Sequence, residues 1–111
     1  MSKVKLTDYV VEFLQKKGIH DFFGYQGTMI AHLVDSIEKN PHVRSHSSYH
    51  EQGAAFAACG YAQAKNACGC AYATSGPGAA NLLSGVADAY FDSLPVRSEE
   101  RRVGKECRSR W

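Results

Sequence analysis

The sequence predicts an α/β fold in which an open parallel sheet carries helices on both faces. Two observations lead to this prediction. Stretches with apolar residues at helical spacing alternate along residues 6–96 with short runs typical of strands. Glycine or proline marks several of the changes, as at Gly18 and Asn40-Pro41. Such alternation implies right-handed crossovers between parallel strands.

The first helix is predicted to begin near residue 6, with Thr7 as its N-cap and Gly18 as its stop. Its apolar residues at helical spacing are Leu6, Val10, Phe13 and Leu14. A first strand should follow at about residues 21–24. The chain would then turn into a second helix, which packs its own apolar stripe on the sheet.

The second helix should end before Asn40-Pro41, because the residue before a proline is driven out of the helical region. Its apolar stripe consists of Ile30, Leu33, Val34 and Ile37. Residues 43–47 form the next predicted strand. The helix predicted over residues 53–64 is rich in alanine and glycine, so its backbone can come close to another helix or to another subunit.

Residues 68–73 form a short apolar run that predicts a third strand, and residues 79–91 predict a fourth helix. A further strand should begin at Leu94-Pro95-Val96. Three aromatic residues at helical positions are expected in the core, and these are Tyr61, Tyr90 and Phe91.

Residues 1–96 have the length of one small domain, and residues 97–111 differ from them abruptly in composition. This tail segment (residues 97–111) has no apolar periodicity. It resembles the in-frame translation of a sequencing-library adapter, so we interpret it as a non-native addition to a truncated gene. The partial domain would then end at residue 96, and its last strand would be interrupted there.

The net charge changes sign at the same boundary, after residue 96. Residues 1–96 carry seven Lys and Arg against eight Asp and Glu, a net charge of −1, whereas the tail segment carries six against three, a net charge of +3. The partial domain thus offers no basic stripe for nucleic acid. No apolar run approaches the roughly 18 residues of a membrane span. Once Cys107 of the tail segment is set aside, three cysteines remain, which are Cys59, Cys68 and Cys70. This odd number without a signal peptide indicates a reducing compartment, which predicts a cytoplasmic protein.

Glu51 is the residue that most suggests an acid–base role. It stands in the run Tyr49–Ala58, where almost every following neighbour is small or apolar. Removal from water disfavours the charged form of a carboxyl group, so that it can hold a proton and donate a hydrogen bond as well as accept one. An isolated glutamate at this place would be explained more simply by the favourable field at a helix start.

Three loops should meet at the carboxyl edge of the parallel sheet, where ligands gather in folds of this kind. They are residues 25–28, 49–51 and 74–78, each after a predicted strand. The third contains Gly76-Pro77-Gly78, which taken alone is as well explained by a tight turn without a ligand. His46 and His50 do not predict a metal site, because four residues of extended chain separate them by about 13 Å.

These motifs resemble those of the thiamine diphosphate-dependent enzymes of the acetolactate synthase and pyruvate oxidase type. The resemblance is to their amino-terminal, pyrimidine-binding domain and covers residues 6–96. Five ordered motifs carry it, which are His50-Glu51-Gln52-Gly53-Ala54, Gly60-Tyr61-Ala62, Thr74-Ser75-Gly76-Pro77-Gly78-Ala79, Asn81-Leu82, and Ala87-Asp88-Ala89-Tyr90 followed by Asp92-Ser93 and Pro95. Tyr25-Gln26-Gly27-Thr28 departs from the Pro-Gly-Gly that is usual after the first strand in members close to acetolactate synthase.

The resemblance implies that Glu51 is catalytic and hydrogen-bonds a ring nitrogen of the aminopyrimidine, which promotes proton removal from the thiazolium carbon. The other residues that it implies for cofactor binding are Gln26, Gly27, Thr74, Pro77 and Asn81. It further implies thiamine diphosphate and Mg²⁺ as cofactors, a 2-oxo acid that is decarboxylated and joined to an acceptor, and a homo-oligomer, and it leaves FAD open.

The family's diphosphate and magnesium motif, a Gly-Asp-Gly followed by paired Asn, does not occur in this sequence. The chain would therefore hold half of a site and be inactive alone. The residues themselves leave two alternatives, which are a non-catalytic module that binds a partner subunit and a module that binds a phosphorylated ligand at the helix start Gly76–Gly78. Neither alternative requires Glu51.

Overall fold

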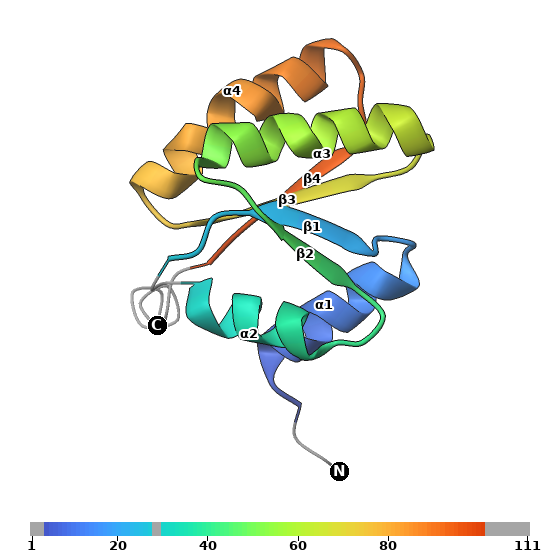
Figure 1. Cartoon of the computed structure of the whole chain (residues 1–111), viewed down its shortest axis with the longest axis vertical. Helices are drawn as coiled ribbons and strands as arrows, with labels where there is room; N and C mark the ends of the chain where they lie inside the picture. The colour runs from blue at the N-terminus through green and yellow to red at the C-terminus, as the bar shows by residue number, and fades with distance from the viewer. Residues whose placement is uncertain (1–3, 28–29, 102–111) are drawn as a thin grey trace, which may run out of the picture.

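The computed structural model describes residues 4–27 and 30–101. Helices and strands alternate along this part of the chain, as the sequence predicts (Figure 1). The elements are α1 (Leu6–Lys16), β1 (Asp21–Gly24), α2 (Ala31–Lys39), β2 (Arg44–Ser47), α3 (Glu51–Lys65), β3 (Gly69–Thr74), α4 (Pro77–Phe91) and β4 (Val96–Arg101). The first strand has the predicted bounds at both ends, and Gly18 follows α1 with the positive φ of a helix stop.

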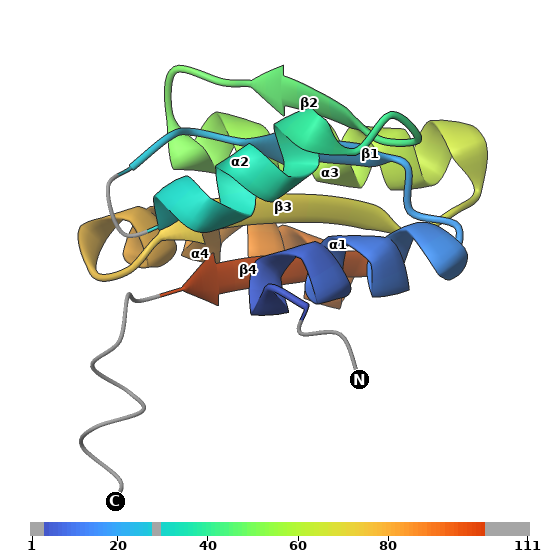
Figure 2. The same cartoon turned by 90° about the horizontal axis from the view of Figure 1, so that it is seen from below.

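The strands of the described chain form one parallel sheet in the order β2-β1-β3-β4. Helices α1 and α2 cover one face of this sheet, and α3 and α4 cover the other (Figures 1 and 2). The predicted α/β fold with helices on both faces is thereby confirmed. Because the strands all run the same way, their carboxyl ends lie along one edge of the sheet.

The side chains of β3 alternate between the two faces and enter two different cores. Cys70 and Tyr72 join the larger apolar residues beneath α1 and α2. Ala71 and Ala73 join alanines of α3 on the other face. The sheet therefore packs against bulky side chains on one face and against small ones on the other.

Small residues bring α3 close to its neighbours. A Cβ atom added to Gly85 of α4 would clash with the Cβ of Ala55, and one added to Gly69 of β3 would clash with the carbonyl oxygen of Ala58. The predicted close approach of the backbone of α3 is thus confirmed, and its neighbours are α4 and β3.

Two expectations about side chains are wrong. Thr7 is not the N-cap of α1, because the cap position is Lys5 and Thr7 is buried in the first turn. The Thr7 hydroxyl accepts a hydrogen bond of 2.7 Å from Ser36 Oγ of α2. Tyr90 and Phe91 are not core residues, since they are 80% and 81% exposed. The inward-facing stripe of α4 ends one residue before them.

The expected interruption after Val96 is also wrong, because the strand continues to Arg101 as β4. Its residues pair in parallel register with the whole of β3, from Gly69 opposite Val96 to Thr74 opposite Arg101. A ladder of this kind is built from backbone groups, so it does not require the apolar periodicity that residues 97–101 lack. Residues 102–111, the rest of the tail segment, lie outside the described residues.

Candidate functional site

Three loops leave the sheet at its carboxyl edge. They comprise residues 25–27 after β1, 48–50 after β2 and 75–76 after β3. Thr28, which the sequence places in the first loop, lies outside the described residues. The second and third loops lead directly into α3 and α4, so a ligand at this edge would meet the starts of both helices (Figure 1).

Glu51 is the first residue of α3 and is buried, with 8% of its surface exposed. The residue before it, His50, caps this helix, because its Nδ1 accepts a hydrogen bond of 3.1 Å from the backbone N–H of Gln52. His50 thus fixes the helix start that carries Glu51. A carboxyl group in this position can accept hydrogen bonds from nearby donors and can donate one when it is protonated.

The first turns of α4 contact the Glu51 carboxyl group. Asn81 Nδ2 donates a hydrogen bond of 3.3 Å to Glu51 Oε2. A Cβ atom added to Gly78 would lie 3.2 Å from Glu51 Oε1, so any larger residue at position 78 would crowd this oxygen. The two oxygens of the carboxyl group therefore face two different residues of α4.

Thr74, the last residue of β3, lies against two glycines of the site. A Cβ atom added to Gly27 would lie 2.6 Å from Thr74 Cβ, and one added to Gly78 would lie 2.7 Å from Thr74 Cγ2. The lack of a side chain at both glycines lets the three segments come together at this point. The structure thus gathers four predicted site residues, which are Gly27, Glu51, Thr74 and Asn81.

Gln26 and Pro77 take other places at the same edge. Gln26 is exposed and lines two cavities, one of about 280 Å³ with Tyr25 and Tyr49 and one of about 500 Å³ along α2. Pro77 is the first residue of α4, where its missing N–H removes no helical hydrogen bond, and it is exposed. Both side chains are accessible to a ligand that approaches from solvent.

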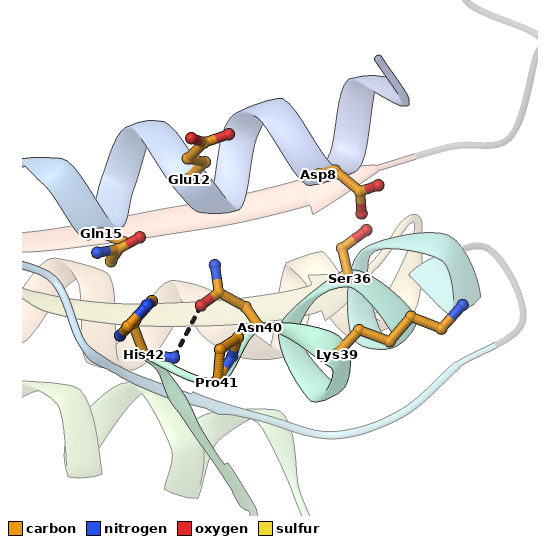
Figure 3. Close-up of a pocket in the computed structure, with 8 residues that line it drawn as sticks. All are labelled: Asp8, Glu12, Gln15, Ser36, Lys39, Asn40, Pro41 and His42. Carbon is orange, nitrogen blue, oxygen red and sulfur yellow. Dashed lines mark hydrogen bonds between the residues drawn. The ribbon is translucent and has the colours of Figure 1, made fainter. Parts of the chain in front are cut away.

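A cavity that the sequence does not predict lies between α1 and the end of α2 (Figure 3). Its volume is about 360 Å³, and most of its lining side chains are polar. They are Asp8, Glu12, Gln15, Ser36, Lys39, Asn40, Pro41 and His42. Because residues 40–42 precede β2, this cavity lies away from the carboxyl edge of the sheet. It arises from the packing of two helices, and no sequence motif falls on it.

A parallel sheet with a buried carboxyl group at its carboxyl edge is the arrangement of a ligand-binding α/β domain. Comparison with known proteins identifies the family. Residues 4–97 match the family described as "Thiamine pyrophosphate enzyme, N-terminal TPP binding domain". The chain belongs to this family, which confirms the resemblance seen in the sequence motifs.

The chain is also similar to acetolactate synthases of plants. It is 45% identical to "Probable acetolactate synthase 2, chloroplastic" of Oryza sativa subsp. japonica, over 96% of this chain and 17% of the rice protein. It is 44% identical to "Acetolactate synthase 1, chloroplastic" of Zea mays and 41% identical to "Acetolactate synthase, chloroplastic" of Arabidopsis thaliana. Both of these matches cover 83% of this chain and 14% of the relative, so the chain spans only a small part of the length of its relatives.

Proposed function

We propose that this chain supplies the pyrimidine side of a thiamine diphosphate site in an enzyme of the acetolactate synthase type. The observation that carries the proposal is the buried Glu51 carboxyl group, bound by Asn81 and faced by Gly78 at the carboxyl edge. Family membership supports the cofactor, and the similarity to acetolactate synthases supports the reaction class. Both favour an enzyme over a subunit-binding or a phosphate-binding module.

The residues of the site fit an aminopyrimidine ring. Glu51 offers a carboxyl group to a ring nitrogen, and the missing side chains of Gly27 and Gly78 let their segments pack closely on Thr74 beside it. Thr74 would border the ring on the side of β3. When bound, thiamine diphosphate supplies the electron sink for decarboxylation of a 2-oxo acid. The contribution of Glu51 is to hold or release one proton at a fixed place.

The proposal also covers the rest of the cofactor, the substrate and the assembly. Since the Gly-Asp-Gly and paired-Asn motif does not occur in the sequence, we assign Mg²⁺ and the diphosphate to a second domain. Gln26 and Pro77 would contact the cofactor from the solvent side. The 2-oxo acid and a homo-oligomeric assembly belong to the same proposal, which leaves FAD open.

Two further proposals concern the chain as a whole. We propose a cytoplasmic location, supported by the odd number of cysteines in residues 1–96, whereas the plant relatives are named as chloroplastic. None of the helices in the described residues is long and apolar enough to cross a membrane. We also propose that the tail segment (residues 97–111) is not native to the enzyme, which a second reading of the gene would test.

The function is tested with a chimera in which residues 4–96 replace the matching residues of the rice acetolactate synthase. We expect this chimera to form acetolactate. Glu51→Gln should lower its turnover by about 10²–10⁴, the range for loss of acid–base help. Gln63→Ala, at an exposed position of α3, serves as the control for substitution on this helix. Full turnover of a folded Glu51→Gln chimera at saturating thiamine diphosphate would contradict the proposed role.

A further inference from the structure

Asn81 binds one oxygen of the Glu51 carboxyl group, and the other oxygen faces a different residue. Asn81 Nδ2 lies 3.3 Å from Glu51 Oε2, whereas Oε1 is the oxygen next to Gly78. Glu51 begins α3, and Asn81 lies one turn into α4, on the same face of the sheet (Figure 1). The bond therefore joins the starts of two neighbouring helices across 30 positions of sequence.

The chemistry of the amide makes this bond directional. A side-chain N–H group can only donate, so Glu51 Oε2 is the acceptor. In a protonated carboxyl group, the carbonyl oxygen accepts a hydrogen bond better than the hydroxyl oxygen does. A donor fixed at Oε2 therefore favours the protonated form in which Oε1 carries the hydrogen.

We propose that Asn81 is a positioning residue for Glu51, which fixes the carboxyl plane through Oε2 and directs the exchangeable proton to Oε1. This inference rests on the proposed function of Glu51 and specifies which of its oxygens serves the ring nitrogen of the cofactor. It also changes the role implied by resemblance, in which Asn81 lines the pyrimidine itself. Asn81 is exposed, so its side chain is not required to fill the core.

The first test uses the whole chain without any cofactor and measures the infrared bands of the Glu51 carboxyl group, whichever its protonation state. The Glu51 band is identified by its absence in Glu51→Gln. Asn81→Leu keeps a similar size and removes the donor, so the Glu51 band should shift in frequency. Asn81→Gln retains an amide and should move the band less. An unchanged Glu51 band in a folded Asn81→Leu chain would overturn the proposal.

The second test measures turnover in the chimera with the rice enzyme. Asn81→Leu should lower turnover by about tenfold, the equivalent of one hydrogen bond, and Asn81→Gln should recover part of this loss. Gln63→Ala is again the control. If Asn81→Leu kept full turnover while Glu51→Gln lost it, the positioning role would fail alone. If Glu51→Gln also kept full turnover, the proposed function itself would fail.

Discussion

His46 Nε2 donates a hydrogen bond of 2.8 Å to Oδ1 of the buried Asp21. Arg44 Nε lies 3.2 Å from the same oxygen, so two residues of the edge strand β2 are held by one carboxylate of β1. The His46 ring also stacks on Phe23, with ring centroids 4.8 Å apart. Because the other side chains of β2 contribute little burial, this network adds to the backbone ladder with β1 in holding the strand.

The Asp21 network predicts a dependence of stability on pH. Burial alone would raise the pKa of Asp21, but hydrogen bonds from His46 and Tyr61 and the charge of Arg44 bring that pKa below its ordinary value. Such a carboxylate stabilises the fold above its unfolded pKa of about 3.9, and this stabilisation is lost as the pH falls through the folded pKa.

We therefore expect Asp21→Asn to lower the free energy of unfolding at pH 7 by about 1 kcal/mol, because the buried carboxylate is replaced by a neutral acceptor while its donors Arg44 and His46 are exposed to solvent. The difference between parent and variant should shrink as the pH falls below about 4. Urea unfolding at a series of pH values from neutral to acidic measures both effects. An undiminished difference in acid would show that Asp21 does not act through its charge.

Close packing of α3 on α4 predicts a second effect on stability. A Cβ atom at Gly85 would clash with Ala55, so Gly85→Ala should lower the free energy of unfolding by about 1–3 kcal/mol. Gly60→Ala is the matched control, because no atom lies within 4 Å of a Cβ atom there. It should raise stability by about 0.5–1 kcal/mol. Equal effects of the two substitutions in urea unfolding would refute the packing argument.

Much of this fold could be predicted because its signals are local. The helical spacing of Leu33, Val34 and Ile37 and the proline at position 41 place α2 without knowledge of its partners. The carboxyl-edge position of Glu51 could be predicted too, since it follows from the alternation of helices and strands.

The side-chain contacts could not be predicted in the same way. The bonds Ser36–Thr7, His46–Asp21 and Asn81–Glu51 join residues 25 to 30 positions apart, and each depends on how two elements pack. Threonine often caps helices, but the Thr7 side chain instead joins α1 to α2 through its bond with Ser36. The continuation of β4 beyond Val96 could not be predicted for a similar reason, because its pairing depends on the backbone groups of β3 and not on its own side chains.

Because β4 pairs with β3 as far as Arg101, we expect only the part of the tail segment after Arg101 to be dispensable for stability. A chain ending at Arg101 keeps the whole ladder with β3, so its stability should stay within about 0.5 kcal/mol of the parent. A chain ending at Val96 leaves the backbone of β3 unpaired along that edge, so it should be less stable and should associate. Thermal unfolding and light scattering compare the two. Equal behaviour would mean that β4 contributes nothing.

The division of the cofactor site predicts that the chain alone does not bind thiamine diphosphate measurably and does not decarboxylate 2-oxo acids. The diphosphate contributes the charge-assisted contacts in our proposal, and its binding motif is not in this sequence. Calorimetry with thiamine diphosphate and Mg²⁺ on the soluble chain tests this, with the chimera as the positive control. Micromolar binding by the chain alone would contradict the assignment of half a site.

Gly78 is placed where one added methyl group would have two separable effects. Its Cβ atom would lie 2.7 Å from Thr74 Cγ2 and 3.2 Å from Glu51 Oε1. Gly78→Ala in the chimera should therefore lower the free energy of unfolding by about 1–3 kcal/mol. It should also lower turnover at least about tenfold, because a small misplacement of a reacting group strongly reduces the rate.

Thr74→Ser separates the two effects, since it removes the Cγ2 atom nearest to the new methyl group and does not remove the contact of that methyl group with Glu51 Oε1. The double variant Thr74→Ser, Gly78→Ala should regain stability but not turnover, while Thr74→Ser alone reports what loss of that methyl group does by itself. Thermal unfolding and acetolactate formation are measured on the same samples. If turnover returned together with stability, crowding of Glu51 would not be the reason for a glycine at position 78.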